Sequence, residues 1–344
     1  MKRLLQLLAL FALGACGTAN LAFDTMRPAD ITLPDHIVSV GVINRSLPAE
    51  DKMLGNVLEG VLTGEGIGND RKGSQYCTES LVNFLQDSPR LEAGLINDPE
   101  VKGTGTDEFS LPLPWGKVEE LCRNYGVDAI IVLESFDSDA VRVVSSPIKS
   151  VKTVEGRKVT VIEYKATLRL NIRSGWRIYD VKRKKIIDEN VYNDEKIFTE
   201  KDVSEQGALG KLPSAREAVK AAGVHAGRGM GYRVSPMWVT VNRKYYTNKH
   251  DDFKEAKKLV KAGRIDDAID KWAALAKVQD PEIASRAAYN MALANEYKGN
   301  LQLALNWAEK SKSLGMKEAH NYMLILNRRM IDEERLQEQL INQE

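Results

Sequence analysis

The alternation of apolar and polar residues divides the chain into two regions with different periodicities. The first region, residues 36–246, mixes two-residue alternation, which is typical of strands, with apolar residues recurring every three or four positions, which is typical of helices. Strands are predicted at 37–43, 90–96 and 127–133, and helices at 50–62, 74–86, 115–125 and 214–229. Residues 247–344 show helical periodicity only. The pattern predicts an α/β domain followed by an all-α domain.

The longest strands of the α/β region are predicted within residues 140–191. Even-numbered positions from Ile162 to Ile172 are aliphatic or aromatic, and most of the odd-numbered positions between them are polar. Turn residues at 155–156 and 182–185 give an antiparallel meander of about three or four strands. The uninterrupted apolar run 129–133 indicates a strand covered on both faces. We expect an α+β fold class, in which a mixed α/β sandwich precedes the helical domain.

Two segments of the helical region are similar to each other. Residues 263–268 align with residues 299–304 at an offset of 36 residues, with a glycine at each predicted turn. This pattern resembles the tetratricopeptide repeat, whose period is about 34 residues. A last helix from 317 to about 343 is expected to cap the stack. Because two repeats cannot bury their own faces, we expect them to lean on the α/β domain through residues 238–246.

The first 16 residues have the order of an export signal. Lys2 and Arg3 precede an apolar stretch that ends in Leu13-Gly14-Ala15-Cys16. The stretch is shorter than the roughly 20 residues that a transmembrane helix needs. The last four residues resemble the lipobox of bacterial lipoproteins, and the alternative is a secretory leader with a chance cysteine. We expect residues 1–15 to be removed and Cys16 to carry acyl chains such as palmitate, which anchor stably when two or more are present.

The segment after this cysteine has no periodic pattern. It contains Pro28 and Pro34, so residues 16–35 are expected to form a lipidated tether. In enteric bacteria, an acidic residue directly after the lipidated cysteine retains such lipoproteins in the inner membrane. This chain has Gly17 at that position, and the resemblance therefore favours the outer membrane. Either face of that membrane, periplasmic or surface, stays open.

Composition excludes several classes of protein. The 344 residues are 43% hydrophobic and 28% charged, which is ordinary for a globular chain with two cores. The net charge of +1 includes two cations of the leader, so the mature chain is near neutral and has no electrostatic footprint for nucleic acid. Cys77 and Cys122 lie in predicted helices beside apolar neighbours, and either a disulfide or two buried thiols would fit that setting.

No pattern in the chain predicts an enzyme. The glycine-rich stretches at 64–68, 103–105 and 227–231 lack the strand–glycine–helix order of a dinucleotide site, and Ser74 stands where a phosphate loop has lysine. The four histidines lie far apart, without the spacing of metal ligands. No Gly-x-Ser-x-Gly elbow is present. We expect no catalytic residues, no metal and no cofactor.

Two charged features are interpreted as solvated surface. Asp137 and Asp139 follow the apolar strand, where sites of α/β proteins often lie, but solvent-facing carboxylates are the simpler interpretation. The basic residues 182–185 could contact anionic lipid headgroups, although charged residues are also usual in a hairpin turn.

The candidate partner-binding residues lie on the first helix of the second repeat. If the orientation of tetratricopeptide helices holds, five side chains point into the concave groove: Arg286, Tyr289, Asn290, Leu293 and Glu296. This mixture suits an envelope peptide or helix as the partner. The competing interpretation is that the α/β domain or the capping helix fills the groove, which would make these residues structural.

Taken whole, the chain resembles an uncharacterised family of Gram-negative outer-membrane lipoproteins in which an α/β domain precedes tetratricopeptide-like helices. The segments that carry the resemblance are residues 13–16, 38–45, 235–238 and 287–292. The α/β half is more distantly similar in topology to periplasmic domains of curli-secretion and peptidoglycan-synthase-activator lipoproteins. The family has no assigned activity. The expected function is therefore a membrane-anchored, non-enzymatic scaffold that binds an envelope protein, and the alternative is an oligomerising subunit of a secretion or assembly apparatus.

Overall fold

The computed structural model describes residues 17–46, 67–103, 109–145, 147–154 and 156–340. The expected lipidation site, Cys16, and the predicted helix at 50–62 lie outside these residues. The chain forms two compact units. One, called here the α/β unit, spans Pro28–Met237, and the other, the helical unit, combines Trp238–Glu338 with the segment that ends at Arg27. Within the described ranges, no helix has the length and hydropathy to cross a bilayer.

A six-stranded mixed sheet forms the centre of the α/β unit. Its strands are β2 (Ser39–Asn44), β3 (Glu92–Ile96), β4 (Ala129–Val144), β5 (Ile148–Val154), β6 (Arg157–Asp180) and β7 (Lys185–Asp202). The strand order is β3-β2-β4-β6, and both β5 and β7 pair with β6. Strand β2 runs parallel to β3 and β4, whereas β4, β5 and β7 run antiparallel to β6. The predicted mixed α/β class and its antiparallel meander are confirmed.

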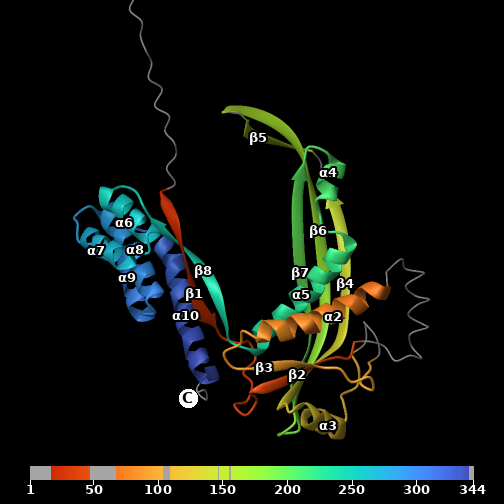
Figure 1. Ribbon diagram of the computed structural model, residues 1–344. Coiled ribbons are helices and arrows are strands. Elements are labelled where there is room, and N and C mark those ends of the chain that lie inside the picture. Colours follow the sequence, from red (N-terminus) through yellow and green to blue (C-terminus); the bar gives the residue numbers. More distant parts are fainter. Residues whose placement is uncertain (1–16, 47–66, 104–108, 146, 155, 341–344) are drawn as a thin grey trace, which may run out of the picture. The chain divides into compact units, whose positions relative to one another are not determined.

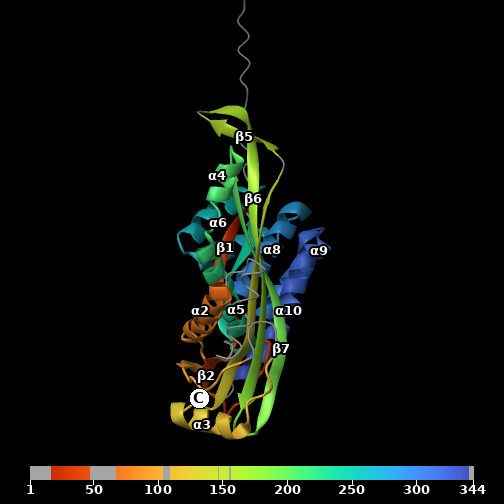
Figure 2. The same cartoon turned by 90° about the vertical axis from the view of Figure 1, so that its right-hand side faces the viewer.

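The two faces of this sheet have different covers. Helices α2 (Ile67–Leu85), α4 (Glu205–Gly210) and α5 (Ala215–Val234) lie on one face, while α3 (Trp115–Tyr125) covers only one end of the other (Figures 1 and 2). The apolar run at 129–133 lies where both faces are covered, because Ile131 belongs to the core with α2 and Ile130 to the core with α3. The prediction of a strand covered on both faces is therefore confirmed.

Helix α5 begins with a capping box at Ser214, the first residue of the predicted helix. The Ser214 hydroxyl accepts a hydrogen bond from the backbone N–H of Glu217, and the Glu217 carboxylate accepts one from the backbone N–H of Ser214. Two N–H groups that lack partners inside the helix are thereby satisfied. The helix continues to Val234, five residues beyond the predicted end.

Glycines let α5 approach α2 closely. The glycine-rich stretch 227–231 lies inside α5, and Gly223, Gly227 and Gly231 all face α2. A Cβ atom built on Gly227 would lie 2.1 Å from the Cys77 carbonyl oxygen of α2, so that no other residue fits without a backbone shift. These glycines therefore have a packing role in the core.

The two remaining cysteines are buried free thiols. Cys77 lies in the core between the sheet and α2, and Cys122 lies in the core on the opposite face. Burial raises the pKa of Cys122 to about 11 and also raises the pKa of Cys77. Of the two alternatives left open by the sequence, the structure shows buried thiols.

The helical unit contains five helices packed in sequence. They are α6 (Asp251–Lys261), α7 (Ile265–Leu275), α8 (Pro281–Tyr297), α9 (Leu301–Ser313) and α10 (Glu318–Leu340). Gly263 and Gly299, at the two predicted turns, have φ values of 74° and 79°, in the left-handed region that favours glycine. The predicted repeat of two helical hairpins and a last helix is present.

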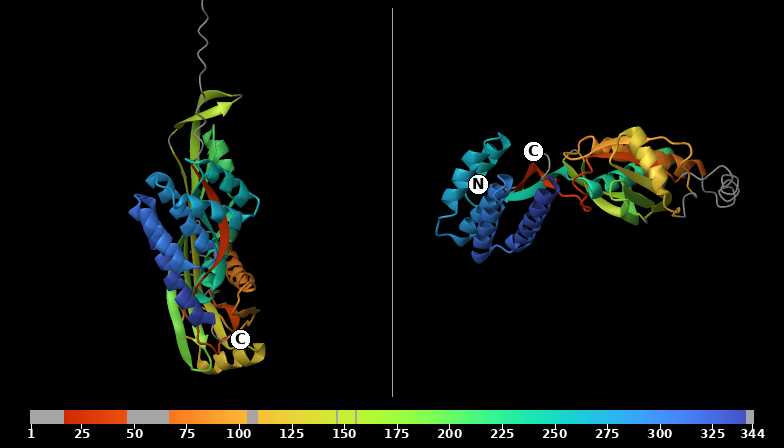
Figure 3. Two further views of the ribbon diagram at one scale, coloured as in Figure 1. Left: turned by 90° about the vertical axis from the view of Figure 1, so that its left-hand side faces the viewer. Right: turned by 90° about the horizontal axis from the view of Figure 1, so that it is seen from below.

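A two-stranded sheet completes the helical unit and corrects one expectation. Strand β1 (Thr18–Arg27) pairs with β8 (Met237–Tyr246), as Figures 1 and 3 show. Leu21 and Phe23 of β1 are buried in one core with Tyr245 of β8 and with the helices. The expectation that this segment is an irregular tether is therefore wrong for residues 18–27. Its short alternation of buried and exposed positions was not recognised as a strand.

The close approach of α5 to α2 predicts a specific loss of stability. Gly227→Ala is expected to lower the free energy of unfolding by about 1–3 kcal/mol, because the new methyl group would displace the α2 backbone. Gly116→Ala is the matched control, since Gly116 in α3 has open space at its Cβ position. Alanine there should leave stability unchanged or raise it by up to about 1 kcal/mol. Equal denaturant midpoints for the two variants would contradict the prediction.

Candidate functional site

The concave side of the α8 helix is occupied by the chain itself. Asn290 is fully buried and makes two hydrogen bonds with the backbone of Tyr246 at the end of β8. Its side-chain oxygen accepts from the Tyr246 N–H at 2.8 Å, and its amide donates to the Tyr246 carbonyl at 2.8 Å. The Asn290 side chain therefore pairs with the backbone of β8 as a neighbouring strand would, and it holds β8 against α8.

A buried carboxylate holds three further elements on this side of α8. Glu296 is buried and accepts hydrogen bonds from Arg243 of β8, Arg329 of α10 and the hydroxyl of Tyr322, also of α10. The distances are 3.0 Å to Arg243 Nε, 3.0 Å to Arg329 Nη1 and 2.5 Å to the Tyr322 oxygen. Arg329 also donates to Thr25 of β1 at 2.6 Å. Glu296 therefore links α8, α10 and β8, and through Arg329 also β1.

The other three predicted groove residues are also contacts within the helical unit. Leu293 is buried in the core. The Tyr289 ring packs against the rings of Tyr246 and Tyr322, and burial raises its pKa to about 12. Arg286 hydrogen-bonds Asn248, pairs with Glu282 at 2.8 Å and lies over the Tyr246 ring.

The five residues therefore lie together, as the repeat orientation predicted, but they do not line an open groove. The expectation of an accessible groove is corrected by the structure: β8 and α10 fill it. This is the outcome that the competing interpretation described, with a strand as an additional occupant. The sequence indicated residues 238–246 as a contact of the repeats, but its periodicity did not predict that this segment enters the groove as a strand.

A pocket of about 470 Å³ lies at the carboxyl ends of β2 and β3, beside α2. Ligands of α/β proteins often bind at this edge of a sheet. Three of the polar side chains that line it, those of Asn44, Thr78 and Asp98, already have partners within the chain. The Asn44 amide binds Ser46 and Ser74, the Thr78 hydroxyl donates to carbonyls of its own helix, and Asp98 pairs with Lys117 at 3.0 Å. The hydrogen bond from Lys117 lowers the pKa of Asp98 against the opposing effect of desolvation.

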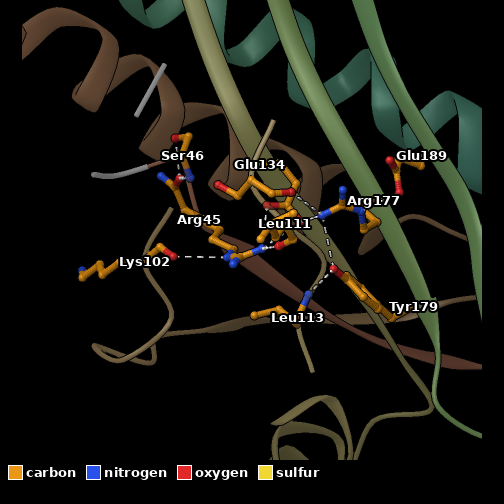
Figure 4. A network of polar contacts seen from close by, with 11 residues as sticks. Arg45, Ser46, Lys102, Leu111, Leu113, Glu134, Arg177, Tyr179 and Glu189 are labelled. Carbon is orange, nitrogen blue, oxygen red and sulfur yellow. Dashed lines mark hydrogen bonds and ion pairs between the residues drawn. The ribbon is translucent and has the colours of Figure 1, made fainter. Parts of the chain in front are cut away.

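A second buried glutamate lies in the sheet near this edge. The register of β4 and β6 shifts between Leu133 and Ser135, and this bulge turns Glu134 toward two arginines (Figure 4). Arg177 donates to the Glu134 carboxylate at 2.6 Å and Arg45 donates at 3.1 Å. Desolvation raises the pKa of Glu134, although both arginines oppose this effect.

Both arginines also hold the loop that precedes α3. Arg45 donates to the Leu111 carbonyl at 2.6 Å, and Arg177 donates to the Ser110 carbonyl at 3.1 Å. The hydroxyl of Tyr179 accepts from the Leu113 N–H at 2.9 Å. The arrangement closes a loop on the sheet, and its donors and acceptors are matched inside the protein. Among the described residues, no group of three His, Cys, Asp or Glu side chains could hold a metal ion.

On the face of the sheet that carries α3, the described residues leave part of the long strands uncovered. We call this surface the bare face: Val141 and Val143 of β4, Thr167 and Arg169 of β6, and Ile197 and Thr199 of β7. Cross-strand register places these residues in two rows, Val141–Arg169–Ile197 and Val143–Thr167–Thr199. Val143 is 58% exposed, and Val141 and Ile197 are each 46% exposed. Asp137 and Asp139 lie on the same face at its end nearer α3, and Asp139 is exposed as expected.

Sequence reasoning missed the bare face. The alternation that predicted strands at 140–191 assigned apolar residues to the covered side and polar residues to solvent. Val141 and Val143 are exceptions to this assignment: both valines lie on the uncovered face, and Arg142 between them lies on the opposite face of the sheet. Two valines at alternate positions were a signal of a second apolar surface.

Two family models match the chain. One is described as a domain of unknown function, DUF8603, and matches residues 37–246; the other, DUF6340, is also a domain of unknown function and matches residues 254–333. No curated protein matches. One similar solved structure is a neuraminyllactose-binding hemagglutinin homologue from Helicobacter pylori, at 10% identity and a TM-score of 0.24, covering 58% of this chain and 86% of that one. At that TM-score, the similarity assigns no function to this chain.

The filled groove predicts that its residues stabilise the helical unit. Asn290→Ala is expected to lower the free energy of unfolding by about 1–3 kcal/mol, because two buried backbone groups of Tyr246 lose their partner. Leu303→Ala, at an exposed position of α9, is the control and should change thermal stability little. If Asn290→Ala instead kept the melting temperature and abolished capture of an envelope partner, the groove would be an open binding site.

Proposed function

This chain belongs to the DUF8603 family, and we propose that it is a lipid-anchored, non-enzymatic protein of the outer membrane that binds another envelope protein through its bare face. We also propose that it is one of the Gram-negative lipoproteins in which a tetratricopeptide-like module follows an α/β domain. The single observation that carries the binding proposal is the exposure of Val141, Val143 and Ile197 on a sheet surface that none of the described helices covers. Contiguous exposed apolar residues commonly mark protein interaction sites.

The polar residues around these side chains also suit a protein interface. Arg169 lies between Val141 and Ile197 and forms an ion pair with Glu195 at 2.9 Å. Thr167 and Thr199 supply hydroxyls in the next row. Arginine is enriched in protein–protein interfaces, which combine apolar side chains with polar ones.

The anchor proposal rests on the lipobox-like sequence before Cys16 and gains a spatial consequence from the fold. Strand β1 begins at Thr18, so only Gly17 separates it from Cys16. A chain spans at most about 3.6 Å per residue. Lipid on Cys16 would therefore hold the helical unit close to the membrane surface instead of at the end of a long tether. The face of the outer membrane stays open in this proposal.

A non-enzymatic role is consistent with the α/β unit. In the pocket beside α2, the side chains of Asn44, Thr78 and Asp98 are bound within the chain, and the Glu134 carboxylate is held by two arginines. Neither arrangement sets a nucleophile beside a base, which is the geometry that covalent hydrolysis requires.

A second candidate function is that of an oligomerising subunit of an envelope assembly. It is favoured by one specific observation: β5 and the first residues of β6 form a two-stranded extension of the sheet with exposed aliphatic side chains. Uncovered strand edges are templates for pairing with another chain.

The anchor is tested by removing the modified thiol. Cys16→Ala is expected to abolish acyl labelling and membrane association, while thermal stability stays unchanged, because all three described cores consist of residues after this one. Metabolic labelling with an alkyne fatty acid and fractionation of envelopes measure these effects. Acyl labelling that persists in the variant would contradict lipidation at Cys16.

The bare face is tested by adding charge at its most exposed aliphatic position. Val143→Lys is expected to reduce capture of the partner from detergent-solubilised envelopes at least tenfold, because a lysine there would have to be desolvated in the interface. Val38→Lys is the matched control, since Val38 is an equally exposed valine of the same unit outside this face. Equal loss in both variants, or loss in neither, would argue against the bare face as the binding surface.

A further inference from the structure

The extension formed by β5 and the start of β6 stands apart from the rest of the sheet. We call it the ribbon: strand β5 (Ile148–Val154) and residues 157–163 of β6. Strand β4 ends before it at Val144, and the pairing of β7 with β6 stops at Asp202 and Tyr164 (Figure 1). Within the described part of the chain, β5 has β6 on one side and no strand on the other.

Two strands alone are a marginal structure in water, because each residue makes few contacts that offset the loss of chain entropy. The ribbon nevertheless carries large aliphatic side chains in the open. Val151 is 65% exposed and Ile162 is 53% exposed. Ile162 lies opposite Lys149, so Val151 and Ile162 are diagonal neighbours on one face. A third and fourth strand would cover part of this apolar surface.

The sequence of β5 is compatible with pairing to itself. If two copies of β5 lie antiparallel with Val151 opposite Val151, each Lys149 faces Thr153 and each Lys152 faces Ser150 of the other copy. No lysine then faces a lysine, and aliphatic side chains meet at the centre. Shifting the register by one residue, so that Lys149 faces Lys152, opposes like charges, which is unfavourable for directly opposed cross-strand pairs.

We propose that the ribbon binds the ribbon of a second copy of this chain, edge to edge and antiparallel, with Val151 on the twofold axis. This inference rests on the second candidate function and specifies its partner and contact. Such a contact is isologous, because the same strand of each copy is buried, and it therefore closes at two copies. The result is a four-stranded sheet in which β5 is no longer an edge.

The charge of the ribbon has an alternative use, which is contact with anionic lipid. Lys149, Lys152, Arg157 and Lys158 are all basic. However, Lys152 is paired with Glu163 across the ribbon at 2.5 Å, and the Glu163 carboxylate also accepts from Ser150 at 2.5 Å. This internal pairing neutralises a cation that a lipid headgroup would need. The second copy is therefore the occupant that the contacts favour.

A single cysteine at the twofold position tests the register directly. In the full-length lipidated protein in detergent micelles, Val151→Cys should form an interchain disulfide under mild oxidation, because opposed residues of antiparallel strands have Cβ atoms about 5 Å apart. Val159→Cys is the control: it is exposed on the β6 strand, and two copies would lie about 14 Å apart across three strand spacings. Cys77 and Cys122 are buried and should not react.

The expected result is a crosslinked dimer for Val151→Cys and no crosslink for Val159→Cys. Val151→Lys should convert the dimer seen by light scattering into a monomer, since two lysines would meet at the axis, while Val159→Lys should not. A wild-type chain that stays monomeric overturns the proposal, including the case in which it binds vesicles of phosphatidylethanolamine and phosphatidylglycerol. A larger oligomer without the Val151 crosslink also overturns it, but leaves the second candidate function standing.

Discussion

A carboxylate that is buried away from water needs hydrogen-bond donors from the protein. In each unit of this protein, the packing depends on supplying such donors to one buried glutamate. Glu134 in the α/β unit and Glu296 in the helical unit are both fully or almost fully buried, and each accepts from two arginines. Leaving such a charge unpaired costs several kcal/mol, whereas the pair itself adds little net stability over an apolar core. The need for donors therefore determines mainly how the elements are arranged, because the elements that carry the arginines must all pack against the glutamate.

The donors come from segments far apart in the sequence, which explains why the helical groove is closed. Glu296 of α8 needs Arg243 of β8 and Arg329 of α10, so both elements must lie on its concave side. Asn290, one turn and a half earlier, binds the end of the same strand. A peptide could enter the groove only by leaving Glu296 without its donors. The polar residues that suggested a binding surface are thus the reason that the surface is occupied.

The sequence predicted local elements well and long-range pairings poorly, for a physical reason. The apolar run at 129–133, the helix that starts near Ser214 and the turn glycines at 263 and 299 each depend on neighbours within a few residues, so they were visible in the pattern. Strand β1 depends on β8, more than 200 residues away, and its ten residues carry only two buried side chains, Leu21 and Phe23. Residues 238–246 and the last helix were expected beside the repeats, but the hydrogen bonds that join them to Asn290 and Glu296 depend on tertiary packing and leave no local pattern.

The exposed aliphatic residues of the sheet are not required by the fold. On the face that α3 covers, the core extends to Val132 and Phe109 lies over Arg177, and none of the described residues covers the strands beyond. Thr167 and Thr199 occupy that uncovered surface beside Val143, which shows that a polar β-branched residue is accepted there. Threonine and valine have similar preferences for strands, so pairing alone does not select valine. Burying an aliphatic side chain gains about 25 cal/mol per Å², so these valines and this isoleucine would add to the stability of an interface, which is the basis of the proposed binding role of this face.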